Sequence, residues 1–257
     1  MRRLAITNQK GGSGKTTTAV NLAAALGELS QRVLLVDLDP QASATEWLVE
    51  ASDGDGLFDV LVGAGGLKRL IRQTAVPNVQ LIPASPALAR AAAKADKKKT
   101  GYHLGPALDR LPPDWDFVLI DCPPATGFLV TSALASSSEV VAPVEAHVMA
   151  LAGLASLVKT VEQVQDRLNP NLAITAIVPC RVNRTSHARE VVERLRQRFG
   201  TLVVDVPIRE SVRLAEAPSF KQAITQYAPS SLGAQDYRAV AAEILARGPA
   251  NGAADLG

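Results

Sequence analysis

The stretch from Thr7 to Thr18, TNQKGGSGKTTT, decides the fold of this chain. It stands between a short apolar run at 2–7 and an alanine- and leucine-rich stretch at 15–30. Three glycines followed by Lys-Thr at the start of a helix are typical of a loop that binds phosphate through its backbone N–H groups. The G-x-x-x-x-G-K-[ST] pattern requires a glycine at position 9, but Gln9 stands there and a second lysine, Lys10, follows it.

The chemistry of the loop residues suggests a role for each of them. Gly11, Gly12 and Gly14 would let the backbone approach phosphate oxygens closely. Lys15 would reach the β- and γ-phosphates of a nucleotide, and the hydroxyl of Thr16 would bind Mg²⁺. The alternative is a glycine-rich turn that binds nothing. The register of strand, glycines, Lys-Thr and helix favours the phosphate loop.

Short apolar runs and longer helical stretches alternate along the 257 residues. The apolar runs, which we expect to be strands covered on both faces, are RRLAIT (2–7), RVLLVD (32–37), VQLIPA (79–84), DFVLIDCPP (116–124), EVVAPV (139–144), LAITAIVPC (172–180) and TLVVDVPI (201–208). Helices are expected at 15–30, 57–61, 67–73, 127–136, 151–168, 186–200 and 236–247. This alternation predicts an α/β fold with a doubly wound, mostly parallel sheet flanked by helices, and ligands at the carboxyl ends of its strands.

The organisation of the chain is simple. We expect one domain over residues 1–247, followed by a disordered tail at 248–257, which lies within the final stretch RGPANGAADLG. The alanine-rich segment 87–111, which contains KADKKKTGYH, is expected to be a solvated helix or loop. There is no internal repeat and no interdomain linker in the sequence.

Composition excludes several classes of protein. Apolar residues make up 47% of the chain and charged residues 20%, as in ordinary globular proteins. The start does not resemble a signal peptide, and no apolar stretch approaches the roughly 18 residues that span a bilayer. Cys122 and Cys180 are too few for a disulfide framework and suit a reducing cytosol. The formal charge is +2, so a nucleic-acid site would need local clustering of basic residues.

Acidic residues follow two of the expected strands. Asp37 and Asp39 come at the end of VLLVDLD, and Asp121 ends FVLID, where the metal-binding aspartate of a phosphate-loop enzyme belongs. A buried carboxylate without a partner is costly, so aspartates at buried strand ends are seldom there for stability alone. The alternatives are a turn or helix cap for Asp39 and a strand-end cap for Asp121.

At KGGSGKTT the sequence resembles the deviant Walker family of ATPases, in which the earlier lysine is the signature residue. The resemblance implies that Lys10 reaches across an ATP-sandwich dimer to the nucleotide of the partner, as an arginine finger does in trans. It implies that Asp39 orients the attacking water, and that Thr16, Asp39 and Asp121 form the metal site, Asp121 through water. ATP and Mg²⁺ are the implied cofactors. The implied nucleotide-binding residues are Lys10, Gly11, Gly12, Ser13, Gly14, Lys15, Thr16, Thr17 and Asp121, and the catalytic residues are Lys10, Lys15 and Asp39.

Within that family the chain is most similar to the ParA branch. The segments ITNQKGGSGKTTTAVNLAAAL, VLLVDLDPQASAT, VLIDCPP, LAGLASLVKTVEQVQ and SVRLAEAPSFKQAI all look like parts of small partition ATPases. Cysteine motifs for an iron–sulfur cluster and a C-terminal amphipathic membrane helix are both missing from the pattern. No helix-turn-helix extension stands ahead of the first strand, so the resemblance is to the short members that bind DNA without sequence preference.

Basic residues gather in the C-terminal third of the chain. Between 181 and 213 eight arginines stand against four acidic residues. Arg184 and Arg213 occupy positions that resemble the nonspecific DNA contacts of the family, and arginine–phosphate contacts would give salt-sensitive, sequence-independent affinity. In the helix expected at 186–200, Glu190 can pair with Arg194. The alternative for the whole cluster is a solvated, salt-bridged face.

These features together predict a ParA-type ATPase that dimerises on ATP, binds nucleoid DNA and positions a chromosome or plasmid with a ParB-like stimulating partner. It would be cytoplasmic and nucleoid-associated, without stable membrane association. An alternative is a carboxysome- or cluster-positioning ATPase similar to McdA, with a McdB-like partner. Less favoured are a metabolic phosphate-loop ligase and a MinD-like membrane-surface ATPase. Two departures from the family are Ser13, where valine is usual, and His147, where glutamate is frequent.

Overall fold

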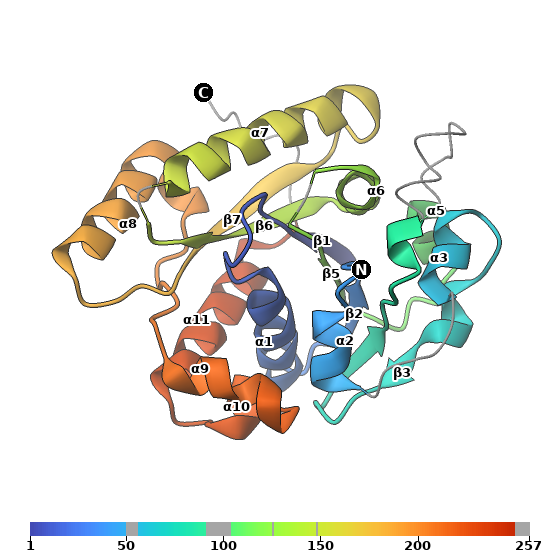
Figure 1. Ribbon diagram of the computed structural model, residues 1–257, viewed down its shortest axis with the longest axis horizontal. Coiled ribbons are helices and arrows are strands. Elements are labelled where there is room, and N and C mark those ends of the chain that lie inside the picture. The colour runs from blue at the N-terminus through green and yellow to red at the C-terminus, as the bar shows by residue number, and fades with distance from the viewer. Residues whose placement is uncertain (50–55, 91–103, 125, 148, 250–257) are drawn as a thin grey trace.

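The computed structural model of the protein describes residues 1–49, 56–90, 104–124, 126–147 and 149–249. Residues 91–103 of the segment 87–111 and residues 250–257 of the expected tail therefore lie outside the described residues. The expectation of a solvated helix or loop was wrong for Leu104–Asp109, a helix that buries Leu104, Ala107 and Leu108 in the core. A seven-stranded sheet forms the centre of the molecule, in the order β3-β4-β2-β5-β1-β6-β7 (Figure 1). The strands are β1 (Arg2–Ile6), β2 (Val33–Asp37), β3 (Arg72–Gln73), β4 (Val79–Ile82), β5 (Phe117–Asp121), β6 (Glu139–Glu145) and β7 (Ala173–Cys180). All pairs are parallel except β3 with β4.

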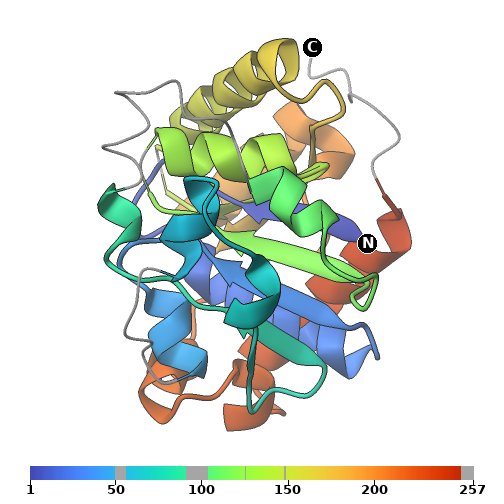
Figure 2. The ribbon, with the colours of Figure 1, turned by 90° about the vertical axis from the view of Figure 1, so that its right-hand side faces the viewer.

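Helices cover both faces of this sheet. The α-helices are α1 (Lys15–Glu28), α2 (Ser43–Leu48), α3 (Gly56–Leu61), α5 (Leu104–Asp109), α6 (Phe128–Ser136), α7 (Ala150–Arg167), α8 (Ser186–Phe199), α9 (Val212–Glu216), α10 (Ile224–Tyr227) and α11 (Leu232–Arg247). The 3₁₀ helices are η1 (Leu67–Leu70), η2 (Gly200–Leu202) and η3 (Ala217–Phe220). Figures 1 and 2 show α7 on one face of the sheet and α1 and α11 on the other. The predicted doubly wound α/β fold is confirmed.

The strand sequences are apolar without interruption because each strand feeds two cores. In β1, Leu4 and Ile6 pack with the helices α1 and α11, while Ala5 belongs to the core under α3, α5, α6 and α7. The same alternation places Leu35 in one core and Val36 in the other, and all five residues are fully buried. A parallel sheet covered on both faces requires this pattern, since successive side chains point to opposite faces.

Three of the expected elements differ from the structure. The strand predicted at 201–208 was wrong: only isolated bridges form there, Ile177 with Val203 and Val182 with Arg209. Asp205 gives its N–H to Glu243 Oε2 at 3.0 Å, and proline at 207 has no N–H to give, so a continuous ladder cannot form. The segment 67–73 is a 3₁₀ helix followed by the short strand β3. Helix α11 begins four residues before the predicted start, at Leu232.

The carboxyl edge of the sheet carries the polar residues singled out in the sequence. In the sheet, β1 lies between β5 and β6, with β2 on one side of it and β6 and β7 on the other. Ligands of doubly wound folds bind at such a switch point in the strand order. Asp121 is the register partner of both Ile6 and Asp37, which brings the ends of β1, β2 and β5 together. In the part of the chain that the structure describes, no helix is long and apolar enough to span a membrane.

Candidate nucleotide-binding site

The loop between β1 and α1 has an open, glycine-dependent backbone. Gly12 and Gly14 adopt left-handed conformations, with φ of 73° and 90°, which other residues rarely adopt. A Cβ atom added to Gly11 or Gly12 would meet nothing within 4 Å, so the outer side of the loop is free to receive a ligand. Gly14 is the N-cap of α1 and offers no side-chain cap, so the first N–H groups of the helix remain available to an anion.

Lys15 is the first residue of α1 and is nearly buried, with 7% of its surface exposed. Its Nζ donates to the backbone carbonyl of Lys10 at 3.0 Å. Burial lowers the pKa of Lys15, whereas the nearby carboxylates of Asp121 and Asp39 act to raise it. The tertiary structure therefore brings the lysine at the start of α1 together with two of the predicted aspartates, one at the end of β5 and one just after β2.

Asp121 supplies the clearest sign that the site takes a cation. It is fully buried, and neither of its carboxylate oxygens has a hydrogen-bond partner among the described residues. Burial raises its pKa well above the ordinary value and the charge of Asp37 adds to this, while the Thr16 hydroxyl, which approaches without reaching hydrogen-bond geometry, and the charge of Lys15 oppose it. A buried carboxylate without partners is costly, and a metal ion with its water ligands would compensate it. The residues present thus fit Mg²⁺ at this position, with Thr16 and Asp121 as its holders.

Asp37 and Asp39 serve different purposes. The Oδ2 atom of Asp37 accepts from the N–H and the hydroxyl of Thr45 at 2.8 and 2.7 Å, and its Oδ1 accepts from Asp39 N at 3.1 Å. Asp37 therefore ties α2 to the end of β2, a role that the sequence did not suggest. Asp39 Oδ1 accepts from the N–H of Gln41 at 3.0 Å, which orients its side chain.

A cavity of about 420 Å³ opens beside the phosphate loop. Gly12, Gly14 and Thr17 form one wall, and the segment 208–215 forms the opposite wall. Cys180 and Tyr237 also line it, and both side chains are buried. Its size and its contact with the loop suit a nucleoside. No sequence pattern pointed to Tyr237, because its place in the cavity depends on the packing of α11 against α1. A larger cavity, about 730 Å³, lies at the amino ends of β2 and β4, away from the loop.

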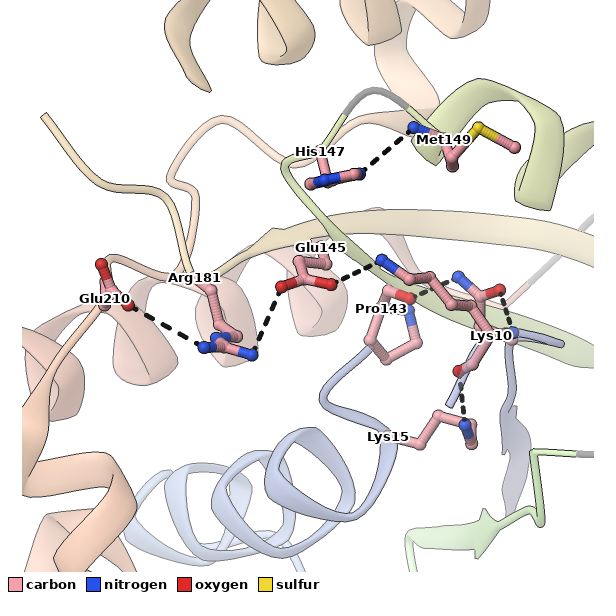
Figure 3. Close-up of polar contacts among 9 residues, drawn as sticks. Lys10, Lys15, Pro143, Glu145, His147, Met149, Arg181 and Glu210 are labelled. Atoms are coloured by element: carbon pink, nitrogen blue, oxygen red, sulfur yellow. Dashed lines mark hydrogen bonds and ion pairs between the residues drawn. The ribbon is translucent and has the colours of Figure 1, made fainter. Parts of the chain in front are cut away.

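The two lysines of the loop occupy separate positions. While Lys15 lies inside the site, Lys10 is 41% exposed in its side chain and forms an ion pair of 2.6 Å with Glu145, the last residue of β6 (Figure 3). The Lys10 N–H donates to Asn8 Oδ1 at 3.2 Å. Ser13 is fully buried, and its hydroxyl has no partner in the described part of the chain.

The arginine cluster is partly neutralised. Arg213, in α9, forms an ion pair of 3.0 Å with Glu216, which also accepts from Tyr227 at 3.0 Å. Arg184 is exposed in the loop before α8 and has no ion pair among the described residues. Other arginines of the cluster are engaged: Arg209 with buried Asp236, Arg194 with Glu190, as expected, and Arg196 with the Asp205 carbonyl. Fewer arginines of the cluster are thus unpaired among the described residues than the sequence suggested.

Comparisons with known proteins show the family of the chain. The family model described as an AAA domain matches residues 1–174. The chromosome-partitioning ATPase Soj of Thermus thermophilus is 44% identical over 248 residues, which cover 96% of both chains.

Two solved structures have the same fold. One is that of cobyrinic acid a,c-diamide synthase from Mycobacterium smegmatis, solved with an ATP analogue and magnesium. Its sequence is 33% identical, the match covers 95% of this chain and 94% of the synthase chain, and the TM-score is 0.82. The other, apo McdA from Cyanothece, has a TM-score of 0.85 at 22% identity, covering 95% of this chain and 99% of its own, and supports the fold alone. The matches over most of the chain, together with the phosphate loop, the clustered aspartates and the adjoining cavity, show that this chain belongs to the AAA-domain family and is a ParA/Soj-type ATPase.

Proposed function

We propose that the protein is a partition ATPase whose ATP-bound form dimerises, binds DNA without sequence preference and is stimulated by a ParB-like partner. The separation of the two loop lysines carries this proposal. Lys15 lies with Asp39 and Asp121, whereas the Lys10 side chain lies on Glu145, outside that cluster. Because the Lys10 side chain takes no part in the site of its own protomer, its position supports a role at the nucleotide of another copy.

The residues of the site suggest how hydrolysis proceeds. Lys15 and the first N–H groups of α1 would stabilise the negative charge of the β- and γ-phosphates. When bound by Thr16 and Asp121, Mg²⁺ supplies further neutralisation of the phosphate charge. Asp39, oriented by the N–H of Gln41, would accept a hydrogen bond from the attacking water and align it. Lys10 of the second copy would complete the charge stabilisation, so hydrolysis should be slow until the dimer and its partner assemble.

DNA binding would depend on Arg184 and Arg213. Dimerisation doubles the number of phosphate contacts, which makes affinity depend steeply on the nucleotide state. Arg213 must leave Glu216 to contact a phosphate, so its net contribution should be smaller than that of Arg184, which has no such pair among the described residues. On this proposal the protein would act in the cytoplasm on nucleoid DNA.

The test is binding to a random DNA duplex with ATP, ADP or no nucleotide, at two salt concentrations. We expect binding only with ATP, weakened by salt, and retained in the slowly hydrolysing Asp39→Ala variant. Arg184→Ala should weaken binding about fivefold or more, and Arg213→Ala less. Arg194→Ala, which removes an exposed arginine paired with Glu190, is the matched control and should have little effect. Equal binding with ATP and ADP would contradict the proposal.

The 33% identity to cobyrinic acid a,c-diamide synthase favours a second candidate, an ATP-dependent amide-forming enzyme. A corrinoid acid is much larger than a nucleoside and carries several carboxylates. The cavity beside the phosphate loop, about 420 Å³, is of a size for the nucleoside and is flanked by Glu210 as well as by arginines. ATP turnover that requires a corrinoid acid and glutamine would favour this candidate, and turnover raised by DNA with a ParB-like protein would exclude it.

A further inference from the structure

Glu145 stands between two cations at the carboxyl edge of the sheet. Its Oε2 atom is 2.6 Å from Lys10 Nζ, and its Oε1 atom is 3.3 Å from Arg181 Nη1. Arg181 Nη2 lies 3.9 Å from Glu210 Oε1, which completes a chain of four alternating charges (Figure 3). The side chain of Glu145 is 23% exposed, so this network is less open to solvent than an ordinary surface pair.

The backbone around Lys10 holds its side chain in reach of Glu145. Asn8 donates from Nδ2 to the Pro143 carbonyl of β6 at 2.7 Å, and its Oδ1 accepts the Lys10 N–H at 3.2 Å. The Lys10 carbonyl in turn accepts from Lys15 Nζ at 3.0 Å. The loop is therefore attached to β6, the strand that ends at Glu145. Little further conformational entropy is lost when Lys10 pairs with Glu145.

The same network reaches the cavity beside the phosphate loop. Arg181 and Glu210 both line that cavity. Arg181 has a φ of 54°, a left-handed conformation that is unusual for a residue with a side chain and that directs the chain sharply after β7. A nucleoside in the cavity would therefore lie beside the network that holds Lys10.

We propose that Glu145 is a positioning residue that holds Lys10 within its own protomer in the resting state, and that the Lys10–Glu145 pair must open before Lys10 can act across a dimer. The inference rests on the proposed function, because it concerns the lysine that this function assigns to the second copy. Because opening this ion pair costs free energy, the Glu145 carboxylate would set a threshold for ATP-driven dimerisation.

The ion pair itself is tested in the free protein. Its hydrogen bond to Lys10 lowers the pKa of Glu145, and Arg181 and His147 contribute to the same effect. A carbon-13 NMR titration of labelled glutamate, with Glu145→Gln identifying the signal, should give a Glu145 pKa below the ordinary range. Lys10→Met should return it towards that range, whereas Lys159→Met, which removes an exposed lysine of α7, should not. An identical Glu145 titration in wild type and Lys10→Met would overturn the proposal.

The threshold is tested by sedimentation with a non-hydrolysable ATP analogue. Two pairs open per dimer, and at about threefold for each half-exposed pair, Glu145→Gln should lower the dimer dissociation constant roughly tenfold. Glu145→Asp, which keeps the charge on a shorter side chain, should fall between. Glu190→Gln breaks another carboxylate pair of 2.6 Å, on α8, and should match wild type.

The outcomes separate the two hypotheses. If wild type stays monomeric with the analogue, the proposed function is wrong and the inference falls with it. If wild type dimerises and Glu145→Gln dimerises equally or less well, while unfolding at the same temperature as wild type, the proposed function stands and Glu145 is not a restraint on Lys10.

Discussion

At the scale of single residues, Asp121 combines two properties that rarely occur together. It is fully buried, and its carboxylate has no hydrogen-bond partner among the described residues. Such a group destabilises the fold and is kept where a ligand compensates it. Asp121→Asn should therefore stabilise the nucleotide-free protein while it removes the metal holder.

In a chelating buffer at neutral pH, we expect Asp121→Asn to unfold at a temperature roughly 4–8 °C higher than wild type, or about 2 kcal/mol. ATP hydrolysis with Mg²⁺ should be lost. Asp39→Asn is the control, because Asp39, with 9% of its surface exposed, accepts a hydrogen bond from Gln41, so its effect on stability should be smaller. An Asp121→Asn protein less stable than wild type would refute this account.

Asp37 gives a prediction about pH. Burial raises its pKa to about 6, against three hydrogen bonds that lower it. The folded state then holds a proton on Asp37 that the unfolded state has lost, so the free energy of unfolding should fall as pH rises between about pH 4 and pH 6. Asp37→Asn should be less stable throughout, because its amide has one acceptor oxygen in place of two and cannot accept from both Thr45 and Asp39, but it lacks this titration. Urea unfolding of both proteins should show their difference shrinking as pH rises, and a constant difference would count against the assignment.

At the scale of elements, helix α1 shows how packing overrides propensity. A Cβ atom on Gly27, near its C-terminal end, would lie 2.5 Å from the carbonyl oxygen of Pro77. Gly153, in α7, has room: its nearest neighbour would be Asn8 Oδ1 at 3.7 Å. The backbone of the segment before β4 therefore approaches α1 closely, and only glycine permits it.

Alanine at these two glycines should have opposite effects. Gly27→Ala should destabilise the protein by about 1–3 kcal/mol through steric overlap, although alanine is the better helix former. Gly153→Ala should stabilise it by about 0.5–1 kcal/mol. Chemical denaturation of both variants gives the comparison, and two changes of the same sign would show that helix propensity outweighs packing here.

The long elements followed from the sequence and several short ones did not. Helix α8 was expected at 186–200 and is observed at Ser186–Phe199, because its apolar side chains recur at helical spacing and Thr185 caps it. Helices α2, α9 and α10 have four to six residues, too few for a periodic pattern. They form because tertiary partners hold them, as Asp37 holds Thr45 at the start of α2.

At the scale of the whole molecule, the nucleotide should act as part of the structure. The site joins the ends of β1, β2 and β5 to a cavity walled by the start of α9 and the segment before it. A ligand that binds only the folded state stabilises it, by about 2.7 kcal/mol at a hundredfold excess over its dissociation constant.

Thermal unfolding with and without ATP and Mg²⁺ should show this as a rise of roughly 5–10 °C in the unfolding temperature. A chelator should remove most of the rise, since Asp121 then loses its compensating ion. Lys15→Ala should show almost no rise, because it loses the contact with the β- and γ-phosphates. A full rise in Lys15→Ala would contradict the phosphate-loop assignment.

The sequence by itself determined the fold class, the phosphate loop and the positions of the aspartates. These depend on local patterns: apolar runs of strand length, helical periodicity, and glycines followed by Lys-Thr. It also singled out Lys10, as a departure from the usual loop pattern.

Only the tertiary structure decided the partners of these groups. It joined Lys10 to Glu145 and Arg209 to Asp236, and it left Asp121 without a hydrogen-bond partner in the described chain. Glu145 lies 135 positions from Lys10, so no local pattern could connect them. Burial, charge pairing and the walls of a cavity arise when distant segments meet, and the state of each charged residue follows from that meeting.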